Sequence, residues 1–174
     1  ITIEDPIEYH LTGITQTQVN IEKSYDFANG LRAILRQDPD VILVGEIRDK
    51  ETADTAMHAA LTGHLVFSTL HTNNAVGTIP RLLDLGVSPS IIAPAINVAM
   101  AQRLVRRLCP SCKKKQKVSA DELSLLKKYL SDPAKKIKMP AFSESTEVYV
   151  PDKCKECNFT GYRGRIGLYE LFEI

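Results

Sequence analysis

The sequence predicts an α/β fold, in which a parallel sheet flanked by helices is followed by a small cysteine-bearing subdomain. Over residues 1–104, short apolar strands alternate with amphipathic helices, an order that builds a parallel sheet. Beyond residue 104 come a basic stretch, a short helix and a polar loop, with a cysteine pair on each side. Apolar residues make up 44% of the 174, enough to bury a core.

The first predicted elements are two strands and a helix. Residues 1–4 form a candidate strand halted by Pro6, and residues 14–19 alternate apolar and polar positions, as a half-buried strand does. Ser24 is placed to cap a helix that runs to about Arg36. The inner face of this helix would carry Phe27, Leu31, Ile34 and Leu35.

The next elements continue the alternation. Residues 41–44 are continuously apolar, which predicts a strand buried on both faces of a parallel sheet. A helix follows over about 51–62, and Gly63 is expected as its left-handed C-cap. Residues 65–70 form the next buried strand of the prediction.

Two further helices are predicted before residue 104, beyond which the composition of the sequence changes. Asn74 can cap a helix that ends at Gly86, and Ser88 followed by Pro89 can open another that runs to about Leu104.

The cysteine-bearing part is predicted as a small inserted subdomain. Ser119 and Glu122 form a capping box, and the helix behind it has an apolar stripe of Leu123, Leu126 and Leu130. A loop rich in Pro, Lys and Ser follows over about 131–147. The prediction therefore divides the chain into an α/β core at 1–104, a subdomain at 105–160 and a segment at 161–174 that returns toward a C-terminal helical part.

Bulk properties exclude several classes of function. Lys and Arg total 22 against 21 Asp and Glu, so net charge gives no reason to expect nucleic acid, an anionic membrane or an acidic substrate. No apolar run approaches the roughly 20 residues that cross a bilayer, and no signal peptide opens the chain. We expect a soluble intracellular protein. Because Ile1 begins what resembles a strand interior, we also expect a fragment of something longer.

Polar side chains follow three of the predicted strands. In a parallel α/β sheet, ligands bind at the carboxyl ends of strands, and these ends carry the segments 4–8, 45–49 and 68–73. Acidic residues at strand ends are often only solvated turns or helix caps. Here Gly45 permits close backbone approach and Pro6 fixes a turn, which a generic loop does not require. Carboxylates beside a histidine suit a Mg-nucleotide site.

Three motifs in these segments resemble those of the secretion ATPase superfamily. Residues 3–9, IEDPIEY, are similar to its Asp box, residues 35–49, LRQDPDVILVGEIRD, to its Walker B segment, and residues 62–73, TGHLVFSTLHTN, to its His box. The order is that of the family, and the resemblance runs through essentially the whole chain. It implies a RecA-like P-loop NTPase core that hydrolyses ATP with Mg²⁺.

The resemblance also implies roles for individual residues. Glu8 would be the general base that orients water, Glu46 would organise Mg²⁺ through its hydration shell, and His71 would contact the γ-phosphate or relay its loss. Glu4 and Asp5 would support the same site.

Three further residues are candidates for contacts with the nucleotide. Arg32 and Arg36 lie four apart, on one face of a helix. They are either exposed solubilising charges or arginines that stabilise phosphate charge or bridge subunits. The resemblance adds His64 of the His box to this set. Arg48, by contrast, is predicted to form a structural ion pair.

The phosphate-binding loop is missing from the sequence. No G-x-x-x-x-G-K-[ST] motif occurs, so the backbone cage and lysine for the β- and γ-phosphates are absent. The resemblance places that loop upstream of Ile1. We expect these residues alone to bind ATP weakly and not to turn it over.

All four cysteines fall into two Cys-x-x-Cys pairs, Cys109 with Cys112 and Cys154 with Cys157. This is the ligand set of a closed, tetrahedral structural zinc site. Thiol switching or two disulfides are the alternatives, although no thioredoxin-like context surrounds either pair. The tetracysteine insert and residues 161–171 resemble the assembly and secretion ATPases rather than the pilus retraction ATPases.

Three hypotheses of function follow. In the first, the resemblance implies a homo-hexameric motor with ATP, Mg²⁺ and Zn²⁺, peripheral to the inner membrane in the cytoplasm, with a membrane platform protein and associated cytoplasmic secretion or pilus proteins as partners. The second is a zinc-containing nucleic-acid-binding module, disfavoured by the near-neutral net charge. The third is a recruitment piece without catalysis. Support for the second comes from the basic residues Arg103, Arg106, Arg107, Lys113, Lys114, Lys115 and Lys117.

Overall fold

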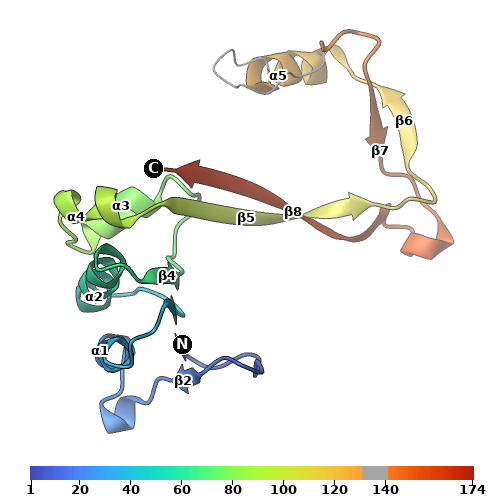
Figure 1. The fold of residues 1–174 in the computed structure, drawn as a ribbon. Coiled ribbons are helices and arrows are strands. Elements are labelled where there is room, and N and C mark those ends of the chain that lie inside the picture. Colours follow the sequence, from blue (N-terminus) through green and yellow to red (C-terminus); the bar gives the residue numbers. More distant parts are fainter. Residues whose placement is uncertain (131–140) are drawn as a thin grey trace. The chain divides into compact units, whose positions relative to one another are not determined.

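The computed structural model describes residues 1–130 and 141–174 (Figure 1). These residues form two compact units, one of residues 1–102 with 169–174 and the other of residues 103–168. Part of the predicted loop at 131–147 lies outside the described residues. In the described part of the chain, no helix combines the length and apolar character needed to cross a membrane.

The first unit contains the predicted parallel sheet. Its four strands lie in the order β2-β1-β3-β4, and every pairing between them is parallel. The strands are β1 (Thr2–Glu4), β2 (Gln16–Gln18), β3 (Val41–Val44) and β4 (Leu65–Ser68). The parallel α/β prediction is confirmed.

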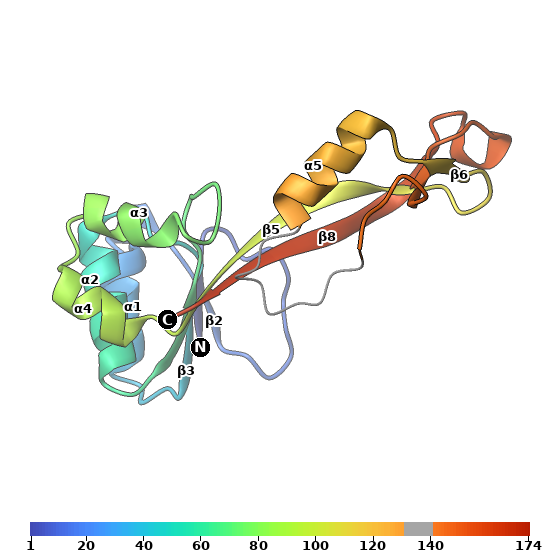
Figure 2. The same cartoon turned by 90° about the horizontal axis from the view of Figure 1, so that it is seen from above.

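Helices of this unit pack against the sheet. Figure 2 shows α1, α2 and α4 on the same side of it. The buried core between them is aliphatic, with Ile3, Leu31, Ile34, Ile42, Val44 and Leu82 fully buried. The helices are α1 (Phe27–Leu35), α2 (Lys50–Leu61), α3 (Thr78–Asp84) and α4 (Pro89–Ala95).

Strand β3 is buried on one face only, so the prediction of two buried faces is wrong. In β3, Ile42 and Val44 are fully buried, whereas Val41 and Leu43 are 43% and 38% exposed. In β4, Leu65 and Phe67 are 50% and 52% exposed. Within the described residues, helices cover one face of the sheet, and the alternation of side chains along each strand leaves the other face open.

The start of α1 differs from the prediction. Ser24 does not cap this helix, because its backbone is left-handed, with φ of 55°, and it ends the 3-10 turn η1 (Ile21–Lys23). Asp26 is the cap, with a side chain that accepts a hydrogen bond from the backbone N of Asn29 at 2.7 Å. An ionised carboxylate is a stronger acceptor than a hydroxyl for the free N–H groups in the first turn of a helix.

The start of α3 also differs. Asn74 was expected as its cap, but the helix begins at Thr78, and the side chain of Asn74 instead accepts from the backbone N of Gly77 at 2.8 Å. The preceding helix, α2, agrees with the prediction of a helix that ends before a left-handed Gly63. This glycine has a φ of 103° just after the helix, a conformation that favours glycine.

The helix predicted to run to about Leu104 ends at Ala95 instead. The backbone is already extended at Ile96, and the chain continues as strand β5 (Val98–Leu108). Pro94 lies in the last turn of the helix and has no N–H for it. Strand β5 pairs with β8 (Tyr162–Glu173), and this distant partner overrides the local helical pattern.

The described residues of the second unit include a small antiparallel ladder and the helix α5. Strands β6 (Lys114–Lys117) and β7 (Glu147–Val150) pair with each other, and η2 (Lys155–Cys157) carries the second cysteine pair. The predicted capping box of α5 (Ala120–Leu130) is confirmed, since Ser119 N donates to Glu122 Oε2 at 2.8 Å and Glu122 N to Ser119 Oγ at 3.3 Å.

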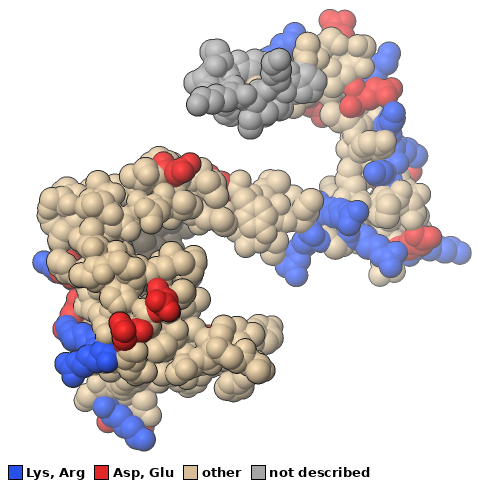
Figure 3. Space-filling view, viewed as in Figure 1, with Lys and Arg blue, Asp and Glu red and all other residues tan. Residues whose placement is uncertain are grey.

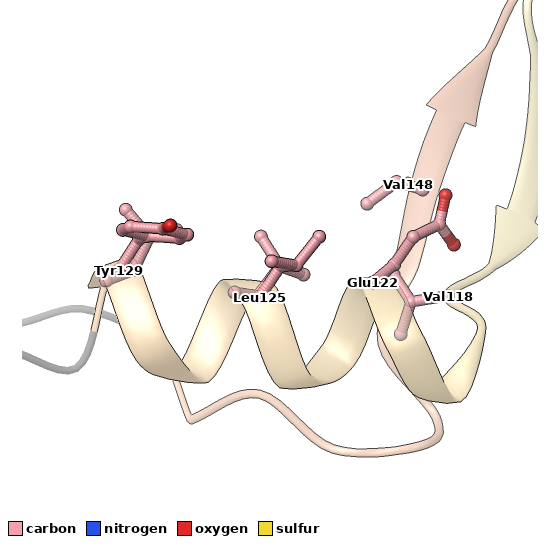
Figure 4. A pocket seen from close by; sticks show the side chains of 7 residues that line it. Val118, Glu122, Leu125, Tyr129 and Val148 are labelled. Atoms are coloured by element: carbon pink, nitrogen blue, oxygen red, sulfur yellow. The ribbon is translucent and has the colours of Figure 1, made fainter.

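The surface of the second unit combines basic and apolar regions. On the face drawn in Figure 3, Lys and Arg side chains gather over the parts of β5 and β8 that belong to the second unit, and around η2. Along α5 lies an open pocket of about 430 Å³. Apolar side chains dominate its lining, which includes Val118, Leu125, Tyr129 and Val148 (Figure 4).

Candidate functional site

The candidate site lies at the carboxyl edge of the parallel sheet. Because β3 and β4 pair with Val44 opposite Ser68, both strands end at the same edge. Two bonds continue the pairing beyond the strands. The backbone N of Ile47 donates to the carbonyl of Thr69 at 3.0 Å, and the hydroxyl of Thr69 donates to the carbonyl of Gly45 at 2.7 Å.

This pairing brings Glu46 and His71 into contact. Oε2 of Glu46 lies 3.0 Å from Nε2 of His71, and Oε1 lies 2.5 Å from a guanidinium nitrogen of Arg48. The side chain of Glu46 is 13% exposed, against 59% for Arg48 and 79% for His71. The ion pair predicted for Arg48 is confirmed. A mostly buried carboxylate therefore lies between two exposed partners.

Glu46 is held in its ionised form. The hydrogen bond from Arg48 is the main cause that lowers the pKa of Glu46 below its ordinary value, and the contact with His71 lowers it further, while burial opposes both. A fixed negative charge with remaining lone pairs can accept hydrogen bonds from the water shell of a hard cation.

The end of β1 passes close beside this group. A Cβ atom on Gly45 would lie 3.2 Å from the carbonyl oxygen of Ile3 and 3.3 Å from the Cα of Glu4. The predicted need for glycine at this close backbone approach is confirmed. The charge of Asp5 contributes to the raised pKa of Arg48, behind the larger effect of Glu46. The charges of Asp5 and Arg48 therefore interact, although the two side chains form no ion pair among the described residues.

The two remaining acidic candidates differ from each other. Glu4 accepts hydrogen bonds from the hydroxyl of Thr2 at 2.5 Å and from the amide of Gln16 at 3.0 Å, and the bond from Thr2 is the main cause that lowers its pKa. Glu8 is exposed, and within residues 1–130 and 141–174 its carboxylate has no hydrogen-bond or ion-pair partner. The structure does not bring Glu8 into contact with Glu46 or His71.

The other candidates for nucleotide contacts lie apart from the Glu46 cluster. Arg32 forms an ion pair with Glu51 of α2, which links two helices. Arg36 is exposed at the end of α1. His64 precedes β4, at the opposite end of that strand from His71, and its Nδ1 lies 3.0 Å from the carbonyl of Ala59. Their roles toward a nucleotide stay predictions.

The four cysteines converge in the second unit. Their Sγ atoms all lie within 4.8 Å of one another. Three pairs are 3.6–3.8 Å apart: Cys109 with Cys154, Cys112 with Cys157, and Cys154 with Cys157. Sulfur atoms on a tetrahedral zinc, with Zn–S bonds of about 2.3 Å, lie about 3.8 Å apart, whereas a disulfide has an S–S length of about 2 Å. The geometry fits zinc and not two disulfides.

Burial and hydrogen bonds shift the pKa values of the thiols in this centre. The N–H of Gly161 donates to Sγ of Cys157 at 3.2 Å. Burial raises the pKa of the Cys112 thiol to about 12. Burial is the largest single effect on Cys157 and raises its pKa, but the hydrogen bonds with the backbone of Cys154 and Gly161 and with the thiols of Cys154 and Cys112 together lower that pKa to about 6. Four thiols so close together cannot all ionise without a cation among them.

The fold and the two sites define a class: a parallel α/β domain with a carboxylate–imidazole cluster at its strand ends and a four-cysteine centre. The chain belongs to the family described as "Type II/IV secretion system protein", which matches residues 1–174.

Curated relatives agree with this family. The chain is 53% identical to "Type II secretion system protein E" of Klebsiella pneumoniae over 171 residues, which cover 98% of the chain and 32% of that protein. It is 47% identical to "Type IV pilus assembly ATPase PilB" of Myxococcus xanthus over 170 residues, 98% of the chain and 28% of that protein. The chain thus spans about a third of the length of the curated relatives it matches.

Solved structures of a pilus retraction motor and of an ATPase have a related fold. The structure of "the Pilus Retraction Motor PilT and Bound ADP" matches with a TM-score of 0.57 and 44% identity, over 63% of this chain and 34% of that one. The Legionella pneumophila "ATPase DotB" matches with a TM-score of 0.52 and 36% identity, over 60% of this chain and 32% of that one. These neighbours support the α/β fold class predicted from the sequence.

One prediction concerns the charge of the cluster. Replacing Arg48 by Gln should raise the pKa of Glu46 toward 4.5, because the bond from Arg48 is the main cause that lowers it. A lowered carboxyl pKa contributes stability that is present above pH 4.5 and is lost as the pH falls through the folded-state value. Titration of the Glu46 carboxyl by ¹³C NMR measures the change. Arg36→Gln is the matched control, and an unaltered pKa in Arg48→Gln would contradict the assignment.

Proposed function

We propose that this chain supplies the hydrolytic part of an ATP site in a motor that drives type II secretion or type IV pilus assembly. The observation that carries the proposal is the 3.0 Å contact between Glu46 and His71 at the carboxyl edge of a parallel sheet, where α/β proteins bind ligands. Relatives with the names of a secretion system protein and a pilus assembly ATPase support it.

Each residue of the cluster has a proposed role. Glu46 orients the water shell of Mg²⁺, and its lowered pKa keeps it charged for that task. The imidazole of His71 contacts Glu46 and is otherwise exposed. It can therefore contact the terminal phosphate or relay its loss. A bound Mg²⁺ would neutralise the charge that develops on the phosphate oxygens. Asp5 and Glu4, at the end of β1, would add negative charge to the same edge of the sheet.

Glu8 is proposed as the general base. It is exposed in the segment that follows β1, the strand that lies beside β3 in the sheet. A base that orients water needs a free carboxylate within hydrogen-bond reach of that water, and such contacts often form only in the substrate complex. The unpartnered carboxylate of Glu8 among the described residues suits this role better than that of Glu4, whose Oε1 already accepts two bonds.

The phosphate-binding loop is proposed to come from another part of the longer protein. No such loop motif occurs in these 174 residues. Strand β4 lies at the edge of the four-stranded sheet, and its side chains Leu65 and Phe67 are half exposed. An additional parallel strand at this edge would bring a phosphate-binding loop to the side of His71. These residues alone would then bind ATP weakly and leave it unhydrolysed.

The assembly is proposed as a homo-hexamer in the cytoplasm, docked on an inner-membrane platform protein. An arginine that bridges subunits must be free of partners in its own subunit. Arg36 is exposed and, in the part of the chain described, has no ion pair, whereas Arg32 is engaged with Glu51. Arg36 is therefore the better candidate for contact with a nucleotide in a neighbouring subunit.

The four cysteines are proposed to hold one structural Zn²⁺. Three of their sulfur separations, 3.6–3.8 Å, match tetrahedral coordination, and all four sulfur atoms lie within 4.8 Å of one another. Cys109 and Cys157 are 0% and 5% exposed. Four thiolates fill the coordination sphere, so this centre would have no open position for catalysis. The metal would stabilise the fold of the second unit rather than take part in hydrolysis.

ATPase assays of the full-length protein test the catalytic roles. Glu46→Gln and Glu8→Gln should each lower kcat by about 100-fold or more, because they remove the charge that organises Mg²⁺ and the base that orients water. Glu22→Gln is the control, since Glu22 is an exposed carboxylate of η1 that contacts neither Glu46 nor His71. Assembly should persist in all variants. Full turnover in Glu46→Gln would overturn the proposal.

Metal analysis tests the cysteine centre. Protein purified without chelator should contain about one equivalent of zinc per chain, and Cys157→Ser should lose it, because a serine hydroxyl is a poor zinc ligand at neutral pH. Ser111→Ala is the matched control, because Ser111 lies between the ligands of the first pair without being one. Less than half an equivalent of zinc in the unaltered protein would favour a redox role instead.

A further inference from the structure

A carboxylate far away in the sequence holds the loop that follows His71. The backbone N–H of Ala75 donates to Oε2 of Glu170 at 3.1 Å, across 95 positions of sequence. Ala75 is 1% exposed, so its N–H has little access to water as an alternative acceptor. Glu170 lies in β8 and belongs to the same compact unit as the loop. Bonds from an N–H to an ionised carboxylate are stronger than those to a neutral acceptor.

The loop itself is tightly folded, so fixing Ala75 fixes its other residues. The N–H of Thr72 donates to the carbonyl of Leu70 at 3.0 Å, and the hydroxyl of Thr72 donates to the carbonyl of Asn74 at 3.0 Å. The side chain of Asn74 then accepts from the N–H of Gly77 at 2.8 Å. These bonds connect the residue after His71 to the start of α3.

His71 lies between two anchors. On its N-terminal side, Thr69 is bound to the segment after β3 through both its hydroxyl and its carbonyl. On its C-terminal side, Glu170 holds Ala75. The side chain of His71 is itself 79% exposed, so packing does little to orient it. Its orientation toward Glu46 therefore depends on the backbone of the loop.

The strand that provides Glu170 is also fixed within this unit. The N–H of Ile174 donates to the carbonyl of Asn97 at 3.1 Å, and the amide of Gln102 donates to the hydroxyl of Tyr169 at 3.3 Å. Glu170 lies between these two attachment points of β8. A carboxylate on a fixed strand can position a loop, whereas one on a freely moving segment could not.

We propose that Glu170 is a positioning residue for catalysis, which keeps the imidazole of His71 against Glu46 through the backbone of the loop at 72–77. The effect of Glu170 on catalysis rests on the proposed function. Its effect on the position of the loop rests on the geometry alone. Glu170 touches neither of the two reacting-site residues. Its effect passes through the N–H of Ala75.

Substitution of Glu170 in the full-length protein tests the catalytic consequence. Glu170→Ala should lower kcat for ATP hydrolysis about tenfold and leave KM for ATP within about twofold, because one charge-assisted bond is lost away from the nucleotide. Glu170→Gln keeps an acceptor oxygen for Ala75 and should retain most of the activity. Glu173→Ala, in the same strand, is the matched control and should leave kcat unchanged.

Two measurements that do not depend on hydrolysis separate this inference from the proposed function. Amide exchange at Ala75 should be about tenfold faster in Glu170→Ala than in the unaltered protein or in Glu173→Ala. A structure of Glu170→Ala should show the contact of His71 with Glu46 lost or lengthened beyond its 3.0 Å. Unaltered exchange, an unaltered contact, or kcat equal to that of the unaltered protein would each overturn the positioning role. If the unaltered protein lacks ATPase activity, the proposed function fails, while exchange and contact still test the loop.

Discussion

The parallel pairing of β3 with β4 is the constraint on which the candidate site depends. With Val44 opposite Ser68, the residues that follow the two strands leave the sheet together, and Glu46 meets His71 at 3.0 Å. A slip of the register by one residue would turn these side chains to opposite faces. The bonds from Thr69 to Gly45 and from Ile47 to Thr69 secure the register just where the sheet ends.

The sequence predicts the parts of this arrangement that depend on local chemistry. Apolar runs that end in polar residues predicted the strands and their shared edge, and Gly45 marked the close backbone approach. Long-range pairing was not predictable in the same way. Residues 98–108 form a strand because β8 pairs with them, and Glu170 reaches Ala75 across 95 positions. The sequence around residues 98–108 has no periodic pattern that indicates β8, and the sequence around Ala75 has none that indicates Glu170.

The small core of the second unit gives the proposed zinc site a structural role. Among its described residues, the buried apolar side chains are few, chiefly Val118 and Leu123 together with the thiols Cys109 and Cys157. A core of that size supplies little hydrophobic free energy. Coordination of one metal ion by both cysteine pairs would connect the two segments that carry them, and the binding free energy would count toward folding.

The most direct test of the central claim is a structure of the full-length protein with Mg²⁺ and a non-hydrolysable ATP analogue. We predict that the metal ion, or a water bound to it, lies within hydrogen-bond reach of the carboxylate of Glu46, with the imidazole of His71 facing the terminal phosphate. A nucleotide bound away from this sheet edge, with the contact between Glu46 and His71 unaltered and remote from the phosphates, would contradict it.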